Sequence, residues 1–336
     1  MVPDAFREAY TAAHQRAAII DRVDRGRIVV SGRDRATYLH GLLTNDITAL
    51  QAGQGCYAAY LTPQGRMITD LWVYELGDVI LLTLALADKD TLLEKLDQFL
   101  FSEDVQLGDV SRTFAGLAVV GPDAARVVGI VLEDAPPNQL AGLVEHGNRR
   151  ARFASQPAIA LQISDTGEPG YEVLVDVSQR DALLAALRAS GAVDIDAAVA
   201  DALRIEAGLP KFHRDMDHDT IPLEAGLESR AISLTKGCYV GQEVIIRVLH
   251  RGHGRVARKL VGLTFEGEVV PAEGAAVQVE GREIGRTTSA SVSPALGRPI
   301  ALAYLHRDFL TPGTRVSVNG LEGVVTVLPF VNRPTS

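Results

Sequence analysis

The spacing of apolar and polar positions predicts a mixture of helices and hairpins over the first 250 residues. Asp88 is a plausible N-cap for a helix whose leucines return on one face. Strands are expected where β-branched and aromatic residues run between turn signals. Helices are thus predicted over 4–22, 33–44, 88–100, 179–191 and 195–207, and strands over 28–30, 56–61, 67–75, 79–85, 117–120, 159–163 and 172–175. Because these elements alternate irregularly, the pattern indicates an α+β fold rather than a doubly wound parallel sheet.

The pattern changes after about residue 259, where short strands are separated by Gly, Pro and Asn-Gly. Asn319-Gly320 between valine-rich runs is a strong signal for a two-residue hairpin. We therefore expect a small C-terminal antiparallel β-barrel. The predicted domains are 1–250 and 259–336, with 251–255 as a linker. The barrel strands are predicted over 260–265, 275–280, 286–291, 300–305 and 315–318.

Composition narrows the class of protein. The chain has 336 residues with Lys+Arg 33 against Asp+Glu 42, a net charge of −9, which argues against a nonspecific DNA binder. Hydrophobic residues at 47% and charged residues at 22% are ordinary for a globular protein, so wholesale disorder is excluded. No apolar run approaches the roughly 18 residues of a membrane span, and the charged N-terminus does not resemble a signal peptide. We expect a soluble, cytoplasmic protein without membrane partners.

The two cysteines, Cys56 and Cys238, are too few for a disulfide-rich scaffold or a four-cysteine metal site. Cys56 is expected in the core of the first sheet. Cys238 could join His250 and His253 around zinc, but this spacing matches no strong zinc pattern. We therefore predict no metal site.

The densest chemical signal is the run Lys236-Gly237-Cys238-Tyr239-Val240-Gly241-Gln242-Glu243. A lysine two residues before a thiol favours the thiolate, and the bracketing glycines permit tight backbone geometry. The alternative is an inert cysteine in a turn. Spacing alone leaves both interpretations open.

The basic run from Arg247 to Lys259 and the carboxylate of Glu206 can each be interpreted as a ligand-binding feature or as solvated surface. The cations from Arg247 to Lys259 have no acid among them, which indicates either an anion-binding segment or a solvated linker. No aromatic residue interleaves them, so a stacking platform for nucleic acid is not supported. Glu206 ends a predicted helix, where the dipole disfavours a carboxylate. It is either held for a ligand or solvated, and the residues alone favour solvation.

The run 236–243 resembles the signature of the YgfZ-like folate-binding proteins, which are related to the glycine-cleavage T-protein, an aminomethyltransferase. The resemblance covers nearly the whole chain. It implies three subdomains around a central pocket that holds tetrahydrofolate or a one-carbon derivative. The supporting segments, which identify only the wider superfamily, are 31–46, 166–172, 203–208 and 221–227.

The resemblance also assigns roles to residues. It implies that the Glu206 carboxylate binds the pteridine edge through paired hydrogen bonds. This replaces the interpretation of Glu206 as a solvated residue. The implied functional thiol is Cys238, tuned by Lys236. The motif loop comprises Gly237, Tyr239, Gly241, Gln242 and Glu243, of which the last two would hold the loop. Tyr57 and Tyr171 are weaker pocket candidates, and we infer that the basic run with Arg247 attracts the anionic folate tail.

One departure separates the two groups of relatives. T-proteins carry Asp-Asp where this chain has Thr69-Asp70, so Thr69 stands in place of the catalytic acid while Asp70 survives. We therefore expect a tetrahydrofolate-binding accessory protein that acts, through Cys238, in the assembly or repair of iron–sulphur enzymes, with client or assembly proteins as partners.

Two alternatives remain, and the sequence leaves open whether the protein is an enzyme. One is a folate-dependent one-carbon (aminomethyl) transferase whose activity depends on Asp70. The other is an RNA-binding module linked to tRNA modification, acting through the basic run.

Overall fold

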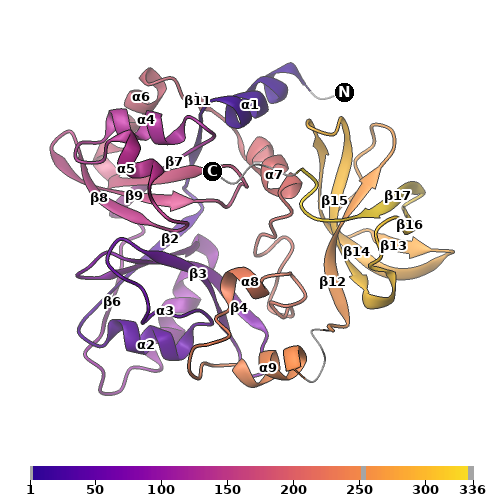
Figure 1. Cartoon of the computed structure of the whole chain (residues 1–336), viewed down its shortest axis with the longest axis horizontal. Helices are drawn as coiled ribbons and strands as arrows, with labels where there is room; N and C mark the ends of the chain where they lie inside the picture. Colours follow the sequence, from indigo (N-terminus) through magenta and orange to yellow (C-terminus); the bar gives the residue numbers. More distant parts are fainter. Residues whose placement is uncertain (1–2, 251–254, 332–336) are drawn as a thin grey trace.

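Three lobes make up the chain in the computed structural model, which describes residues 3–250 and 255–331 (Figure 1). The lobes are built on a six-stranded sheet, a five-stranded sheet and a closed six-stranded barrel. This confirms the expected α+β arrangement of three subdomains with a small C-terminal antiparallel barrel.

The first lobe has a six-stranded sheet in the order β11-β1-β7-β10-β9-β8. Helices cover both faces: α4, α5 and α6 on one side, and α1 and α7 on the other. The strands are β1 (Ala18–Asp21), β7 (Phe114–Val120), β8 (Asn148–Phe153), β9 (Gln156–Ile163), β10 (Gly170–Asp176) and β11 (Val193–Asp194). The helices are α1 (Asp4–Gln15), α4 (Ala124–Val131), α5 (Pro137–Ala141), α6 (Arg180–Ala189) and α7 (Ala197–Glu206).

The second lobe is inserted between β1 and β7 and has an antiparallel sheet in the order β3-β4-β5-β2-β6. Helices α2 and α3 pack on one face, and the chain from 212 to 232 packs on the other together with α9. The strands are β2 (Arg25–Ser31), β3 (Gly55–Leu61), β4 (Met67–Glu75), β5 (Ile80–Ala85) and β6 (Gln106–Asp109). The helices are α2 (Arg35–Leu42), α3 (Lys89–Asp97), α8 (Glu228–Ala231) and α9 (Gln242–His250). Cys56 lies on β3 and packs against this core, as expected.

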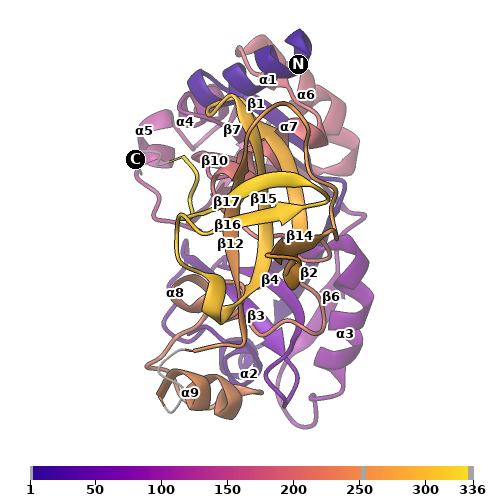
Figure 2. The same ribbon diagram turned by 90° about the vertical axis from the view of Figure 1, so that its right-hand side faces the viewer.

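The third lobe is the barrel, which faces the viewer in Figure 2. Its order is β12-β15-β14-β13-β16-β17, and each pair is antiparallel. Asn319 and Gly320 both have positive φ, 49° and 82°, which confirms the hairpin predicted from their sequence. The strands are β12 (Arg258–Phe265), β13 (Ala276–Val279), β14 (Arg282–Ser293), β15 (Arg298–His306), β16 (Arg315–Val318) and β17 (Leu321–Thr326).

Some expected elements differ from the structure. The helix predicted over 4–22 ends at Gln15, because the chain from Ala18 pairs with β7 and β11 instead. Helix α9 was not expected, since its sequence was taken for the cysteine loop and a basic segment. Residues 251–254 of the predicted linker lie outside the described residues. The domain limits at 250 and 259 stay predictions.

No helix within residues 3–250 and 255–331 is both long and apolar enough to cross a membrane.

Candidate functional site

A buried cluster of charges joins the first two lobes. Arg22, which follows β1, and Arg25, the first residue of β2, both donate to Asp165, which precedes β10. The Arg25 Nη2–Oδ2 distance is 2.8 Å. Burial alone would raise the pKa of Asp165, but the two arginines bring it down to about 2. Its other oxygen, Oδ1, is buried and accepts no hydrogen bond from a described residue.

Asp70 and Tyr57 lie side by side on the neighbouring strands β4 and β3. The Tyr57 hydroxyl donates to Asp70 Oδ2 at 2.5 Å, and both side chains are buried. Burial raises the pKa of Asp70, and the nearby Asp88 raises it further, against the opposing effects of Tyr57 and Arg25. Asp70 therefore holds its proton to a higher pH than an ordinary aspartate, which suits proton exchange.

Aromatic rings and guanidinium groups surround this pair. The Trp72 ring lies 5.0 Å from the Tyr57 ring, centroid to centroid. The Arg25 guanidinium carbon lies 4.3 Å from the Trp72 ring centre, and that of Arg230 lies 5.5 Å from the Tyr57 ring centre. The sequence-predicted Tyr57 and Asp70 are thus brought together, and Arg25 connects them to the Asp165 cluster.

A pocket of about 220 Å³ opens where the first lobe, the chain after α7 and the C-terminal segment meet. Arg230 lines it and also covers the Tyr57 ring, so the pocket adjoins the Asp70 pair. Among its lining residues, Arg230 suits the anionic tail of a ligand, whereas Tyr57, Trp72 and Asp165 are not part of the lining. The other lining residues are Glu145, Ser164, Gly167, Ala207, Leu209, Pro329 and Val331.

Glu206 is completely buried next to the pocket residue Ala207. Its carboxylate accepts hydrogen bonds from the Tyr10 hydroxyl (2.6 Å), the Ser293 hydroxyl and the backbone N–H of Ala295 (3.3 Å). These contacts connect α7 with α1 and with the end of β14. Its predicted contact with the pteridine edge stays a prediction.

Two candidate pocket residues lie elsewhere. Tyr171 is in the apolar core of the first lobe, where its hydroxyl donates to the Leu140 carbonyl at 2.9 Å, so its predicted place in the pocket is wrong. Arg247 is exposed on α9 and does not belong to the 220 Å³ pocket.

Lys236 supports helix α2 instead of the cysteine. Its ammonium group donates to the carbonyls of His40, Leu43 (2.6 Å) and Asn45 (3.0 Å), at the C-terminal end of α2. Burial lowers the pKa of Lys236 to about 8, although Asp46 and Cys56 act in the opposite direction. The expected tuning of Cys238 by Lys236 is therefore not supported, because the ammonium group is committed to the helix.

The rest of the motif forms a surface loop against the β3–β4 turn. Cys238 is exposed, and the buried Tyr239 hydroxyl has no hydrogen-bond partner among the described residues. Gly241 has a φ of 84° and its missing Cβ would lie 2.6 Å from the Thr62 carbonyl oxygen. The loop is closed by a long hydrogen bond (3.4 Å) from Gln242 Nε2 to the Gly237 carbonyl, while Glu243 is exposed in the first turn of α9.

Three polar residues near Asp70 form contacts that the sequence does not reveal. The Asp88 carboxylate lies 2.8 Å from His213 Nε2 and accepts a hydrogen bond from the Thr69 hydroxyl at 3.0 Å. Asp88 is the N-cap residue of α3, as predicted, but its side chain makes no capping hydrogen bond. Nothing in the local pattern indicates this contact, because 125 residues separate Asp88 from His213.

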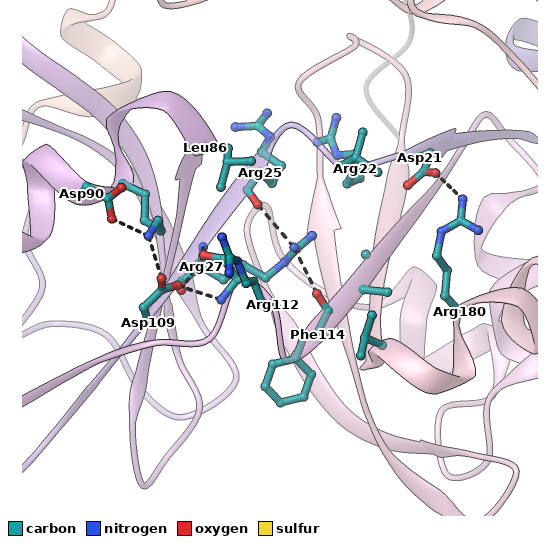
Figure 3. Close-up of a pocket in the computed structure, with 16 residues that line it drawn as sticks. Asp21, Arg22, Arg25, Arg27, Leu86, Asp90, Asp109, Arg112, Phe114 and Arg180 are labelled. Atoms are coloured by element: carbon teal, nitrogen blue, oxygen red, sulfur yellow. Dashed lines mark hydrogen bonds and ion pairs between the residues drawn. The ribbon is translucent and has the colours of Figure 1, made fainter.

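A cavity of about 430 Å³ lies between the first two lobes and is lined by many charged residues (Figure 3). These residues mostly pair with one another: Lys89 with Asp90 and Asp109, and Asp21 with Arg180. Tyr57 and Asp70 do not line it, although Arg22 and Arg25 do, so the cavity reaches the Asp165 cluster but not the Asp70 pair.

No group of three or more His, Cys, Asp or Glu within 3–250 and 255–331 is arranged to hold a metal ion. The zinc set considered from the sequence includes His253, which lies outside the described residues.

Comparison with known proteins gives consistent matches over almost the entire chain. The GCVT N-terminal domain family matches residues 2–236, and the glycine cleavage T-protein C-terminal barrel domain family matches residues 258–333. An aminomethyltransferase of Streptomyces coelicolor is 32% identical, covering 97% of this chain and 90% of that protein. An aminomethyltransferase of a Nostoc species is 31% identical, covering 97% and 86%.

A solved structure of an aminomethyltransferase also matches this chain. The crystal structure of the glycine cleavage system aminomethyltransferase T from Bartonella henselae superposes with a TM-score of 0.88 at 25% identity, covering 97% of this chain and 89% of that one. The expected main function, an accessory role in iron–sulphur enzyme assembly or repair, is therefore wrong, because these near-full-length relatives are named for aminomethyl transfer. Both the sequence and the three-lobed fold establish that this chain belongs to the family of the glycine cleavage T-protein.

Proposed function

We propose that this protein is a folate-dependent one-carbon transferase, which moves a methylene unit from an amine donor to tetrahydrofolate. The aminomethyltransferase family uses tetrahydrofolate, and relatives with that name align with 97% of the chain. Tetrahydrofolate supplies the nitrogen atoms that accept the one-carbon unit. No comparison supports iron–sulphur clients, and the YgfZ-like subtype and the cytoplasmic location stay predictions.

The residues around the 220 Å³ pocket fit this cofactor. Arg230 lies at the pocket wall with its guanidinium over the Tyr57 ring, where it suits the carboxylates of a folate tail. The buried, unpartnered Oδ1 of Asp165 suits the amino and N–H groups of a pteridine edge. Trp72 and Tyr57 offer ring faces for stacking.

The observation that carries the proposal is the environment of Asp70. This carboxyl group is buried, hydrogen-bonded by Tyr57 and shifted toward its protonated form. Such a group keeps its proton to a higher pH than a solvated aspartate, and when ionised it stabilises developing positive charge. Thr69 has no carboxylate, so Asp70 performs this role in our proposal.

The test is a transfer assay with the purified protein, tetrahydrofolate and a panel of aminomethyl donors that includes an aminomethylated lipoyl carrier and small aminomethylated thiols. We expect formation of methylenetetrahydrofolate, and Asp70→Asn should lower kcat roughly 10²–10⁴-fold. Calorimetry should show nearly unchanged tetrahydrofolate affinity for this variant, because the cofactor contacts remain.

Asp219→Asn is the matched control, since Asp219 is exposed and, among the described residues, forms its ion pair with Arg66 on the surface. It should leave kcat unchanged. A wild-type protein that binds tetrahydrofolate but transfers no carbon from any donor contradicts the proposed function.

A further inference from the structure

His213 and Asp88 form a carboxylate–imidazole pair beside the proposed site. His213 Nε2 lies 2.8 Å from Asp88 Oδ1. A carboxylate only accepts hydrogen bonds, so it selects the tautomer with hydrogen on Nε2 and leaves the Nδ1 lone pair available. The second carboxylate oxygen, Oδ2, is held by the Thr69 hydroxyl. Asp88 is thus fixed on both oxygens.

The histidine is unusually placed. Its φ is 67°, in the left-handed region that a side chain rarely adopts. Its side chain is 43% exposed, while that of Asp88 is 8% exposed. Its ring packs edge-on against the ring of Phe212. The titratable side chains in contact with it are Asp88 and His218. Among the described residues, Nδ1 has no hydrogen-bond partner. A strained backbone, a buried orienting carboxylate and an open nitrogen are together typical of a proton-transfer group.

This pair is directly connected to Asp70. Thr69 precedes Asp70 on β4, and the Thr69 hydroxyl lies within hydrogen-bond distance of both Asp88 Oδ2 (3.0 Å) and the Asp70 carbonyl (3.1 Å). Asp88 is also close enough to raise the pKa of the Asp70 carboxyl group. The position where T-proteins carry an acid therefore holds a threonine that orients another carboxylate.

We propose that His213 is a second acid–base group of the one-carbon transfer, positioned by Asp88 and Thr69. This inference rests on the proposed function and names a group that the family resemblance does not assign. In this chain the imidazole supplies the proton-transfer capacity that Thr69 lacks.

The proton balance is simple. Moving a CH2 unit from an aminomethyl donor breaks the bond between carbon and the donor's leaving group and the bond between carbon and the amine nitrogen. Two bonds form from that carbon to folate nitrogens, which lose their two hydrogens as protons. One proton goes to the leaving group and one to the departing ammonia. His213 takes a proton from a folate N–H at Nδ1 and returns it to the leaving group, so the imidazole ends neutral.

The most informative variant is His213→Gly, because glycine adopts positive φ without strain and the fold is kept. We expect kcat to fall roughly 10²-fold with KM for tetrahydrofolate little changed. Added imidazole should restore much of the activity, a rescue that a purely structural role would not give. Asp88→Asn should also lower kcat, and nitrogen-15 NMR should show that His213 no longer favours the Nε2–H tautomer.

His218→Gly is the matched control, since His218 is also exposed but has no carboxylate partner among the described residues. It should keep wild-type kcat. Wild-type kcat in His213→Gly, or a loss that imidazole does not restore, overturns the inference.

A second readout does not depend on turnover. Acylation of histidines by diethyl pyrocarbonate, mapped by mass spectrometry, should be slowed at His213 and not at His218 when tetrahydrofolate is added. If the wild type transfers no carbon, the proposed function fails, and protection of His213 still places it beside the cofactor. Absence of protection overturns the inference in either case.

Discussion

The Asp165 carboxylate binds Arg22, which follows β1, and Arg25, the first residue of β2, and is itself largely buried. Its ionised form is stabilised by Arg22 and Arg25 against a large cost of burial. Removing the charge leaves two buried guanidinium groups without this partner. Asp165→Asn should therefore lower the free energy of unfolding by about 3–5 kcal/mol, measured by urea unfolding at neutral pH.

The contribution of Asp165 to the free energy of unfolding depends on pH because folding lowers the pKa of this carboxyl group. The pKa of Asp165 is lower in the folded protein, about 2, than its ordinary value near 4. Its stabilising contribution is therefore complete above pH about 4 and is lost as pH falls toward 2. The stability difference between wild type and Asp165→Asn should shrink over this range. A difference that stays constant down to pH 2 contradicts the assignment.

At the level of single residues, the sequence predicts local features but not contacts between distant parts of the chain. The place of Cys56 in the core of the second lobe could be predicted from the local strand pattern. The role of Lys236 could not, since its carbonyl partners lie more than 190 residues earlier in the chain. Proximity in sequence suggested Cys238 as its partner, whereas three backbone carbonyls bind the ammonium group more completely. Asp165 and His213 were missed for the same reason.

The loop that carries Cys238 is fitted to the β3–β4 turn at one glycine. Gly241 has positive φ, and a Cβ there would lie 2.6 Å from a backbone oxygen of Thr62. Gly241→Ala should destabilise the protein by at least the roughly 1–2 kcal/mol cost of a left-handed residue. Urea unfolding measures this.

Gly237→Ala is the control within the same loop. Beyond the neighbouring residues, no heavy atom lies within 4 Å of the place that a Cβ would take there, and its φ is ordinary. This substitution should change stability by less than about 0.5 kcal/mol. Equal unfolding midpoints for the two variants would show that the loop is not anchored at Gly241.

Most strands and helices with local turn signals were predicted correctly, including β4 and β16 at both ends. Strands β8 and β17 were missed although their hairpin partners are adjacent in sequence, whereas two other failures lie where a distant segment decides the conformation. Residues 18–21 continue the polar and apolar mixture of α1 but pair with β7, which lies about a hundred residues later. Helix α9 packs its apolar side on the second sheet, and that sheet is not visible in the local pattern.

Helix α7 connects all three lobes through two buried side chains. Arg204 donates to Asp215 and to the Ser289 hydroxyl of β14, and Glu206 accepts from Tyr10 and Ser293. Ser293→Ala leaves a buried carboxylate with one fewer donor. We expect a loss of about 1–3 kcal/mol in the free energy of unfolding and a weaker connection between the barrel and the other lobes.

The measurement uses the single tryptophan, Trp72, which lies in the second lobe. Tryptophan fluorescence and circular dichroism should follow one urea transition in the wild type and two separate transitions in Ser293→Ala. Ser178→Ala is the control, since its hydroxyl bonds only to Asp176 at the surface. Coincident transitions in Ser293→Ala would show that Ser293 does not couple the lobes.

The insertion of the second lobe between β1 and β7 sets an order for the newly made chain. Residues 25–109 leave the ribosome as one uninterrupted stretch and include every strand of their sheet. Strand β1 is synthesised before them, yet both of its partners, β7 and β11, follow later. During synthesis the inner lobe can assemble while β1 waits, unpaired and apolar, for the outer lobe to close around it. The first described strand is thus among the last to be paired, although it is made before the whole inner lobe.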